Sequence, residues 1–323
     1  MYIDGINAER AGSAGFRTMV GRYSRRKRDR FWEIDFLRGV CVLLMVFDHF
    51  MYCLWDVMPD INNTLGTSLF SEWRRAAIRY WSWEVRVTVR MVVIFTFFIL
   101  SGISCTLTRG NFRRCIPLAL VAWGITEVTG VIDDNFIDGA HILFGVIHMI
   151  ACGVFMYALL DNAVSAVVPL FGKGRRARKA ENILRYFPGA VGVGFLIFFF
   201  VYCADLSFEG GAHFVSHIAA DGDLSENLFR AVFVYLNDLN GFEFERYSAD
   251  YFPLLPYAAA ILAGGIIGRA YYHTAAKYTL MPLDGAWNKG FCFLGRHSAV
   301  IFVAHMVVIP VLMGLFALMT SIF

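Results

Sequence analysis

The stretch FLRGVCVLLMVFDHFMYCLWDV at residues 36–57 decides the class of fold. It exceeds the length of about 20 apolar residues that a helix needs to cross the hydrocarbon core of a bilayer. The whole chain of 323 residues has the same character, with 58% hydrophobic and 17% charged residues and a mean hydropathy of +0.55. A soluble domain is about 45–50% apolar and about 25% charged. The sequence therefore predicts an all-α integral membrane protein.

Further apolar runs of comparable length recur along the chain, and we expect them to form one bundle of transmembrane helices. With the first run they make seven spans, and an eighth span starting near residue 228 is the alternative. Residues 33–323 are expected to form this bundle, preceded by a basic segment at residues 1–32. Residues 69–84 have the periodicity of an amphipathic helix that lies in the membrane interface or packs on the bundle. The further spans are expected at residues 87–108, 115–132, 141–160, 187–204, 251–272 and 293–320.

The charged residues between the spans predict their orientation. Residues 1–30 carry eight arginines and lysines against three carboxylates, and the later loops alternate between basic and acidic. By the positive-inside rule the N-terminus is cytoplasmic and, with seven spans, the C-terminus lies outside. The N-terminus is too polar for a secretory signal peptide, so we expect the first span to be retained. No groove-reading motif accompanies the basic residues, which argues against a nucleic-acid partner.

The sequence contains none of the motifs that mark common soluble enzymes. The seven cysteines form no CxxC pair and no metal-ligand spacing, so we expect no metal site. A GxSxG elbow, an HExxH helix, a Walker A loop and a dinucleotide fingerprint are all missing. Chemistry must therefore be sought among ionisable residues inside the spans, which are costly in a bilayer and often functional.

Arg38 and His49 lie on one face of the first span. They are eleven residues apart, which places them about 20° apart around the helix and roughly 16 Å apart along its axis. A guanidinium at the cytoplasmic end suits a phosphate-bearing ligand, and a deeper neutral imidazole suits general-base or nucleophilic work. Asp35 falls within about 40° of His49, whereas Asp48 points about 100° away. The alternative is structural, with an Asp35–Arg38 ion pair and an interhelical hydrogen bond from His49.

Other spans carry residues that allow the same two interpretations. Ser101 and Gly102 are small enough for a neighbouring helix or a ligand to approach the backbone closely. Each ionisable candidate is equally readable as a functional group or as a satisfied structural one. These candidates are His148, Asp250 and His305, and Arg296 stands at the opening of the last span.

Several blocks of sequence, taken together and in order, resemble bacterial members of the heparan-alpha-glucosaminide N-acetyltransferase catalytic-domain family. They extend from residue 33 to about residue 310. The Arg38-to-His49 spacing is also similar to the R-x10-H signature of the wider transmembrane acyltransferase superfamily, with residues 97–102 as a companion motif. The blocks are EIDFLRG at 33–39, MVFDHF at 45–50, FILSGIS at 98–104, FGVIH at 144–148, DYFPLLP at 250–256 and LGRHS at 294–298, followed by His305.

The resemblance implies an acyltransferase of the bacterial cytoplasmic membrane. It would move an acetyl group from cytoplasmic acetyl-CoA to a hydroxyl or amine of a cell-envelope carbohydrate or glycolipid. His49 would be the catalytic histidine, with Asp48 assisting, and Arg38 would contribute to the CoA site. The expected roles of the others are CoA binding for Ser101, Gly102, Arg109 and Arg113, and orientation of His49 or the acceptor for Asp35, His148, Asp250, Arg296 and His305.

Two other classes of protein remain open on the sequence alone. A proton-coupled transporter is equally expected to hold intramembrane Asp, Glu, Arg and His residues, although no internal repeat of the kind common in carriers is recognisable. A regulatory membrane subunit with a degenerate site is the third class, and the presence of both Arg38 and His49 weighs against it. The identity of the acceptor and assembly into a homodimer do not follow from the sequence.

Overall fold

The computed structural model describes residues 31–108, 110–135, 141–142, 144–172, 174–202, 252 and 254–322. Most of these residues are helical, and the described residues contain no β-strand. They fall into two compact units, and the division lies inside one helix, α6 (Glu84–Leu107). The first unit runs to Phe97 and resumes at Tyr278, and the second covers Phe98–Lys277.

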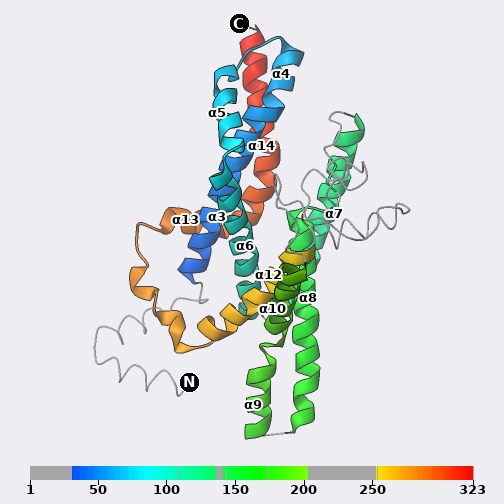
Figure 1. Ribbon diagram of the computed structural model, residues 1–323, viewed down its shortest axis with the longest axis vertical. Helices are drawn as coiled ribbons and strands as arrows, with labels where there is room; N and C mark the ends of the chain where they lie inside the picture. The colour runs from blue at the N-terminus through cyan, green and yellow to red at the C-terminus, as the bar shows by residue number, and fades with distance from the viewer. Residues whose placement is uncertain are drawn as a thin grey trace. The chain divides into compact units, whose positions relative to one another are not determined.

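The first unit is built around a helix that changes its pitch but does not break (Figure 1). It begins as α3 (Trp32–Tyr52), passes through the π-helical turn η1 (Cys53–Val57) and continues as α4 (Met58–Leu65). Gly66 ends it in the left-handed conformation, with φ of 66°, which a glycine adopts without steric cost. The other helices of this unit are α5 (Ser71–Trp81), the first part of α6, α13 (Lys289–Arg296) and α14 (Ser298–Ile322), with the short turn η6 (Met281–Leu283).

Two contacts hold this unit together. Near its start, α3 crosses α13 so closely that a Cβ atom on Gly39 would collide with the carbonyl group of Phe291. At the other end a buried apolar cluster joins η1, α4, α5 and α14. Ala77 of α5 is fully buried in this cluster. Of the two arrangements predicted for residues 69–84, the structure therefore shows the one in which the helix packs on the bundle. The cluster comprises Cys53, Leu54, Met58, Ala77, Met313 and Ala317.

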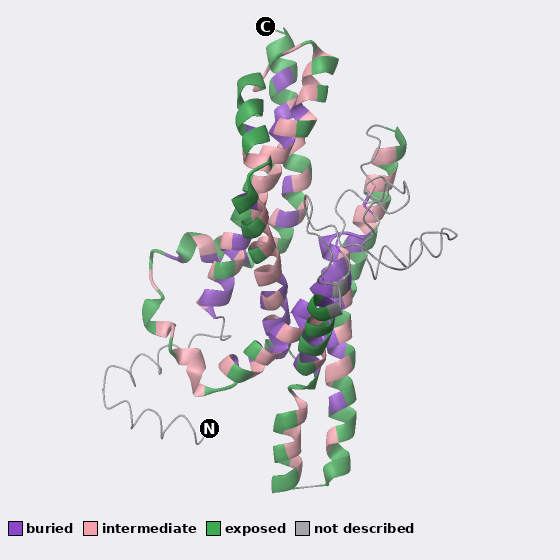
Figure 2. Ribbon diagram, in the orientation of Figure 1, coloured by how far each residue is buried: buried purple, intermediate pink, exposed green. Residues whose placement is uncertain are grey.

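The second unit surrounds one central helix, α12 (Leu254–Ile267), which continues as the π-helical turn η4 (Gly268–Tyr272). Residues 257–262 of α12 are almost completely buried, as the purple segment in Figure 2 shows. Glycines allow this, because Gly102, Gly192 and Gly264 each lie against the backbone of a neighbouring helix. The second part of α6, α8 (Val146–Val167) and α10 (Phe187–Tyr202) pack against α12. The helix α7 (Asn111–Asn135) packs against α8, and α9 (Arg175–Leu184) packs against η2 (Val168–Phe171); η5 (Ala275–Tyr278) follows η4.

The described residues contain six helices that are long and apolar enough to cross a membrane. Their outward faces carry large apolar side chains that only lipid would cover, among them Leu120, Trp123 and Val300. The predicted all-α membrane bundle is therefore confirmed, while the count of seven spans and the orientation stay predictions. The six helices are Trp32–Leu65, Glu84–Leu107, Asn111–Asn135, Val146–Phe171, Arg175–Val201 and Ser298–Ile322.

Three predicted boundaries were wrong in instructive ways. The predicted span at 141–160 begins only at Val146, because the backbone N–H of Ile142 is bonded to the hydroxyl of Thr129 in place of a helical partner. The basic stretch after α8 is not a loop but the helix α9. The predicted span at 293–320 is two helices, α13 and α14, separated at His297. Residues 1–30 and the apolar stretch at 228–236 lie outside the described residues.

Candidate active site

Two histidines face each other inside the first unit. His49 on α3 and His305 on α14 have ring centroids 4.7 Å apart, with the ring planes at 75°. His305 is buried and His49 is half-buried. The structure thus brings together two of the residues singled out in the sequence, from helices at opposite ends of the chain.

The backbone fixes the protonation pattern of both rings. Nδ1 of His49 lies 3.0 Å from the carbonyl oxygen of Met45, and Nδ1 of His305 lies 3.0 Å from that of Ile301. A carbonyl oxygen only accepts, so each Nδ1 must carry the proton and donate it. In the neutral rings each Nε2 then has a free lone pair, and Nε2 of His305 is buried without a partner among the described residues. Both rings are therefore set up to accept a proton at Nε2.

Asp48, the neighbour of His49, is held by a different set of groups. Both of its carboxylate oxygens accept from Arg86, each at 2.8 Å, and one of them accepts from the hydroxyl of Tyr80 at 3.0 Å. Arg86 is buried and its guanidinium lies 3.5 Å from the ring centroid of Trp81. Burial, followed by the charge of Asp48, raises the pKa of Tyr80 to about 12, so Tyr80 stays a donor. Direct assistance of His49 by Asp48 gains no support from these contacts.

We expect Arg86→Gln to destabilise the protein by about 3–5 kcal/mol, because it leaves the buried Asp48 carboxylate without its counter-charge. Thermal unfolding in detergent measures this as a lower melting temperature. Asp48→Asn in the same chain should recover part of the loss, since the uncompensated charge is then gone. The matched control is Arg79→Gln on the exposed face of α5; an equal loss there would contradict the assignment.

The start of α3 is fixed by its crossing with α13. Gly295 lies against the backbone of Asp35 and Gly39, and the guanidinium Nε of Arg296 donates to the Asp35 carboxylate at 3.2 Å. Arg296 is half exposed, so this pair adds little stability by itself. Asp35 thus pairs with Arg296, one turn of helix from the half-buried Arg38.

Ser101 and Gly102 lie in the second unit, where α6 crosses α12. Ser101 is buried. A Cβ atom on Gly102 would collide with the carbonyl group of Ile261, and one on Gly264 would collide with that of Ile99. The face of Gly102 is therefore filled by another helix. Of its two readings, close helix packing is the one that the contacts support.

His148 connects three segments of the second unit. Its Nδ1 accepts from the backbone N–H of Gly145 at 3.2 Å, and its Nε2 lies 2.9 Å from the hydroxyl of Thr126. That hydroxyl donates to the carbonyl of Ile142, so Nε2 of His148 is the donor to it. Both ring nitrogens are thus satisfied, and His148 ties the start of α8 to α7. Arg113 is exposed in the first turn of α7, whereas Arg109 and Asp250 lie outside the described residues.

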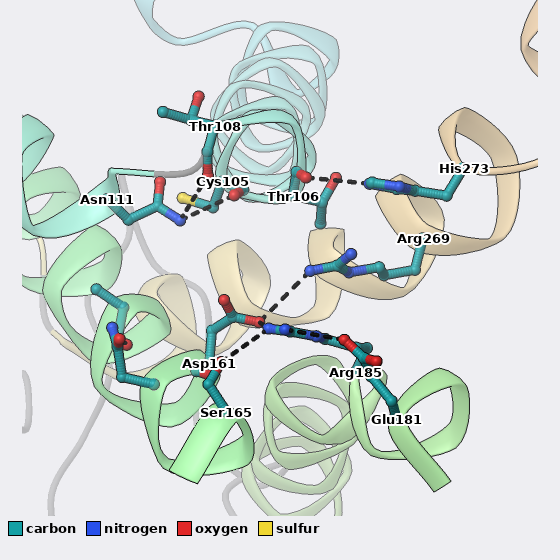
Figure 3. Close-up of polar contacts among 12 residues, drawn as sticks. Cys105, Thr106, Thr108, Asn111, Asp161, Ser165, Glu181, Arg185, Arg269 and His273 are labelled. Atoms are coloured by element: carbon teal, nitrogen blue, oxygen red, sulfur yellow. Dashed lines mark hydrogen bonds and ion pairs between the residues drawn. The ribbon is translucent and has the colours of Figure 1, made fainter. Parts of the chain in front are cut away.

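A second polar cluster went unnoticed in the sequence (Figure 3). Asp161 of α8 accepts at Oδ1 from Arg185 at 3.0 Å and from Arg269 at 3.4 Å. Arg185 also donates to Ser165 and Glu181. The feature of the sequence that indicates this cluster is Asp161, a carboxylate inside an otherwise apolar run, and Asp161 was not among the predicted site residues. The described residues contain no group of three His, Cys, Asp or Glu side chains that could hold a metal.

A helical fold with six helices long and apolar enough to cross a bilayer, and with exposed apolar faces, defines an integral membrane protein. The family model described as heparan-alpha-glucosaminide N-acetyltransferase, catalytic, matches residues 30–172 and 195–307. The chain belongs to this family, which confirms the resemblance noted in the sequence and implies an acetyltransferase. The comparisons with curated proteins and with solved structures find no match.

Proposed function

We propose that the protein transfers an acetyl group from acetyl-CoA to a hydroxyl or amine of a carbohydrate, with Nε2 of His49 as the general base. The observation that carries this proposal is the free Nε2 lone pair of His49, fixed by the hydrogen bond from Nδ1 to Met45. Membership of the acetyltransferase family supports the donor and the reaction class. The acceptor is a cell-envelope sugar or glycolipid in this proposal, and the membrane is the bacterial cytoplasmic membrane.

The chemical step follows from the state of His49. Nε2 removes the proton from the acceptor as its oxygen or nitrogen attacks the thioester carbonyl carbon. The carbon–sulfur bond then breaks, and the proton passes from the imidazolium to the departing thiolate, which leaves as CoA thiol. In the variant mechanism Nε2 itself attacks the thioester carbonyl carbon, the carbon–sulfur bond breaks and CoA leaves as the thiolate. The acetyl-histidine then passes the acetyl group to the acceptor, whose proton is taken up by the thiolate.

The other residues have supporting roles in this proposal. His305 orients His49 through the contact between their rings, and Arg38 contributes to binding of CoA from the cytoplasmic side, together with Arg113. Asp48 acts by fixing α3 to α6 through Arg86. These roles rest on position and charge, and no metal takes part in the step.

Release of free thiol from acetyl-CoA tests the proposal. The protein is purified into lipid nanodiscs and supplied with acetyl-CoA and, in turn, an amino sugar, a neutral hexose or no acceptor. We expect thiol release that depends on the protein and increases with one acceptor class. If a folded sample neither binds CoA nor releases thiol, the acetyltransferase proposal fails and the proton-coupled carrier becomes the better account of the buried histidines.

A further inference from the structure

The cluster around Asp161 holds two guanidiniums and two carboxylates, but the two carboxylates differ in exposure. Arg185, Arg269 and Asp161 expose only 25%, 18% and 23% of their side chains, so solvent screens them weakly. Glu181 adds a carboxylate, but it is 43% exposed and pairs with Arg185 over one helical turn, a contact of little strength. One half-buried carboxylate thus serves two half-buried guanidiniums. The two guanidiniums therefore keep donor groups that a further anion could accept from.

One hydrogen-bond donor in the cluster remains without an acceptor among the described residues. Nε of Arg269 is buried and has no partner among the described residues. The hydroxyl of Tyr157, which lies four residues before Asp161 and so on the same face of α8, is buried beside Arg269 and interacts with it. Tyr157 itself is only 1% exposed. A buried donor left unpaired is costly, and a ligand with several acceptor oxygens would remove that cost.

The backbone around Arg269 is also unusual. Arg269 lies in η4, a π-helical turn, and such turns occur frequently at functional sites. Four residues later, Nε2 of His273 lies 3.0 Å from the carbonyl oxygen of Thr106 in α6. Burial lowers the pKa of His273, and the charge of Arg269 lowers it further. His273 is therefore neutral at pH 7 and leaves the positive charge of the cluster to the two arginines.

Nearby elements add to the positive charge of this end of the second unit. The helix α9, which leads directly to Arg185, carries four exposed basic residues, and the charge pattern predicts that this end is cytoplasmic. Guanidinium groups bind phosphate by paired hydrogen bonds, and phosphate offers more acceptor oxygens than a carboxylate. The four residues are Arg175, Arg176, Arg178 and Lys179.

We propose that Arg185 and Arg269, held in place by Asp161, form a phosphate-binding site at this end of the second unit. The identification of its ligand rests on the proposed function: the site takes phosphate groups of the acyl-CoA donor. The phosphate of an anionic lipid headgroup has the same chemistry and is the other source that a test must separate. Arg185 and Arg269 belong to the second unit, whereas Arg38 belongs to the first.

Binding measurements on the full chain in nanodiscs test this site. The probes are CoA, dephospho-CoA and pantetheine, the last of which keeps the thiol arm and lacks every phosphate. Arg269→Gln and Arg185→Gln should each weaken CoA binding by about tenfold to a hundredfold, the effect of losing a hydrogen bond to a charged group. Pantetheine binding should stay unchanged. If the arginines had a purely structural role, the substitutions would weaken the binding of CoA and of pantetheine alike.

Matched variants make the result interpretable. Arg75→Gln on the exposed face of α5 removes the same charge elsewhere and should leave CoA binding unchanged. Arg269→Lys keeps the charge without the planar fork and should give an intermediate affinity. His49→Ala should bind CoA as wild type does, which separates loss of this site from loss of the reaction. Melting temperatures confirm that each variant is folded.

Three outcomes decide the matter. If both arginine variants bind CoA more weakly but bind pantetheine as wild type does, the site and its ligand are supported. Equal CoA affinity in wild type and both variants overturns the site. If wild type binds no CoA, but phosphatidylglycerol nanodiscs stabilise it over phosphatidylcholine nanodiscs only while Arg269 is present, the phosphate site stands with a lipid ligand. In that last case the proposed acetyl-CoA donor is wrong, so the two failures are distinguishable.

Discussion

His49→Ala should lower kcat for acetyl transfer by about 10²–10⁴-fold, the usual contribution of a general base. The KM for acetyl-CoA should change little, because the imidazole removes a proton only as the acceptor attacks. Thiol release and acceptor product, measured together in nanodiscs, give both parameters. The melting temperature should stay near that of wild type, since His49 is half-buried and its hydrogen bond to Met45 lies within its own helix.

Two other histidines provide controls for this result. His297 makes the same hydrogen bond from Nδ1, to the carbonyl of Phe293 at 2.9 Å, but it is exposed and lies outside the pair. His297→Ala should therefore leave kcat near wild type. His305→Ala should lower kcat less than His49→Ala, because His305 acts through the orientation of His49. A His297→Ala variant as inactive as His49→Ala would contradict the assignment of the base.

Gly102→Val should prevent the protein from reaching a stable fold. A Cβ atom at Gly102 meets the backbone carbonyl of Ile261, which cannot move away as a side chain can. Overpacking destabilises a protein by about 1–3 kcal/mol even where neighbouring side chains adjust, and we expect a larger loss where the neighbour is backbone. We expect little monodisperse protein after purification and a clearly lower melting temperature for what remains.

Glycines on open helix faces are the controls for this prediction. Gly124 of α7 and Gly314 of α14 have nothing within 4 Å of an added Cβ. Gly124→Ala and Gly314→Ala should therefore leave expression and melting temperature unchanged or slightly improved, since alanine favours the helix. Full stability of Gly102→Val would show that α6 and α12 do not cross at this glycine.

The sequence predicted the parts of this protein that depend on local pattern. Apolar runs located most helices, and the helical period placed Arg38 and His49 on one face of the first span. The local pattern could not predict which side chains meet across helices, because these partners come from segments that are distant in the sequence. Nothing in the spacing of α3 indicates that His49 meets His305, or that Asp48 pairs with Arg86 rather than with His49.

Two interpretations show why charge and small residues are ambiguous in membrane sequences. Arg185 ends one of the basic stretches that the charge pattern treats as loops, and in the structure it donates to Asp161 of α8. Because Gly102 has no side chain, either a ligand or a neighbouring helix could approach the backbone there. The position of Ile261 in the structure shows that a helix does so. The start of α8 was misplaced because hydroxyl groups of α7, at Thr126 and Thr129, bind the preceding backbone and hold it out of the helix.

The central claim is that the chain catalyses acetyl transfer at His49, and product formation from isotope-labelled acetyl-CoA tests it most directly. Wild type and His49→Ala are incubated in nanodiscs with the labelled donor and a panel of amino sugars, neutral sugars and glycolipids, and the acceptors are analysed by mass spectrometry. We predict that wild type gives a sugar carrying the labelled acetyl group and that His49→Ala gives almost none. Labelled product formed equally fast by His49→Ala would contradict the account, as would a folded wild type that binds CoA and acetylates no acceptor.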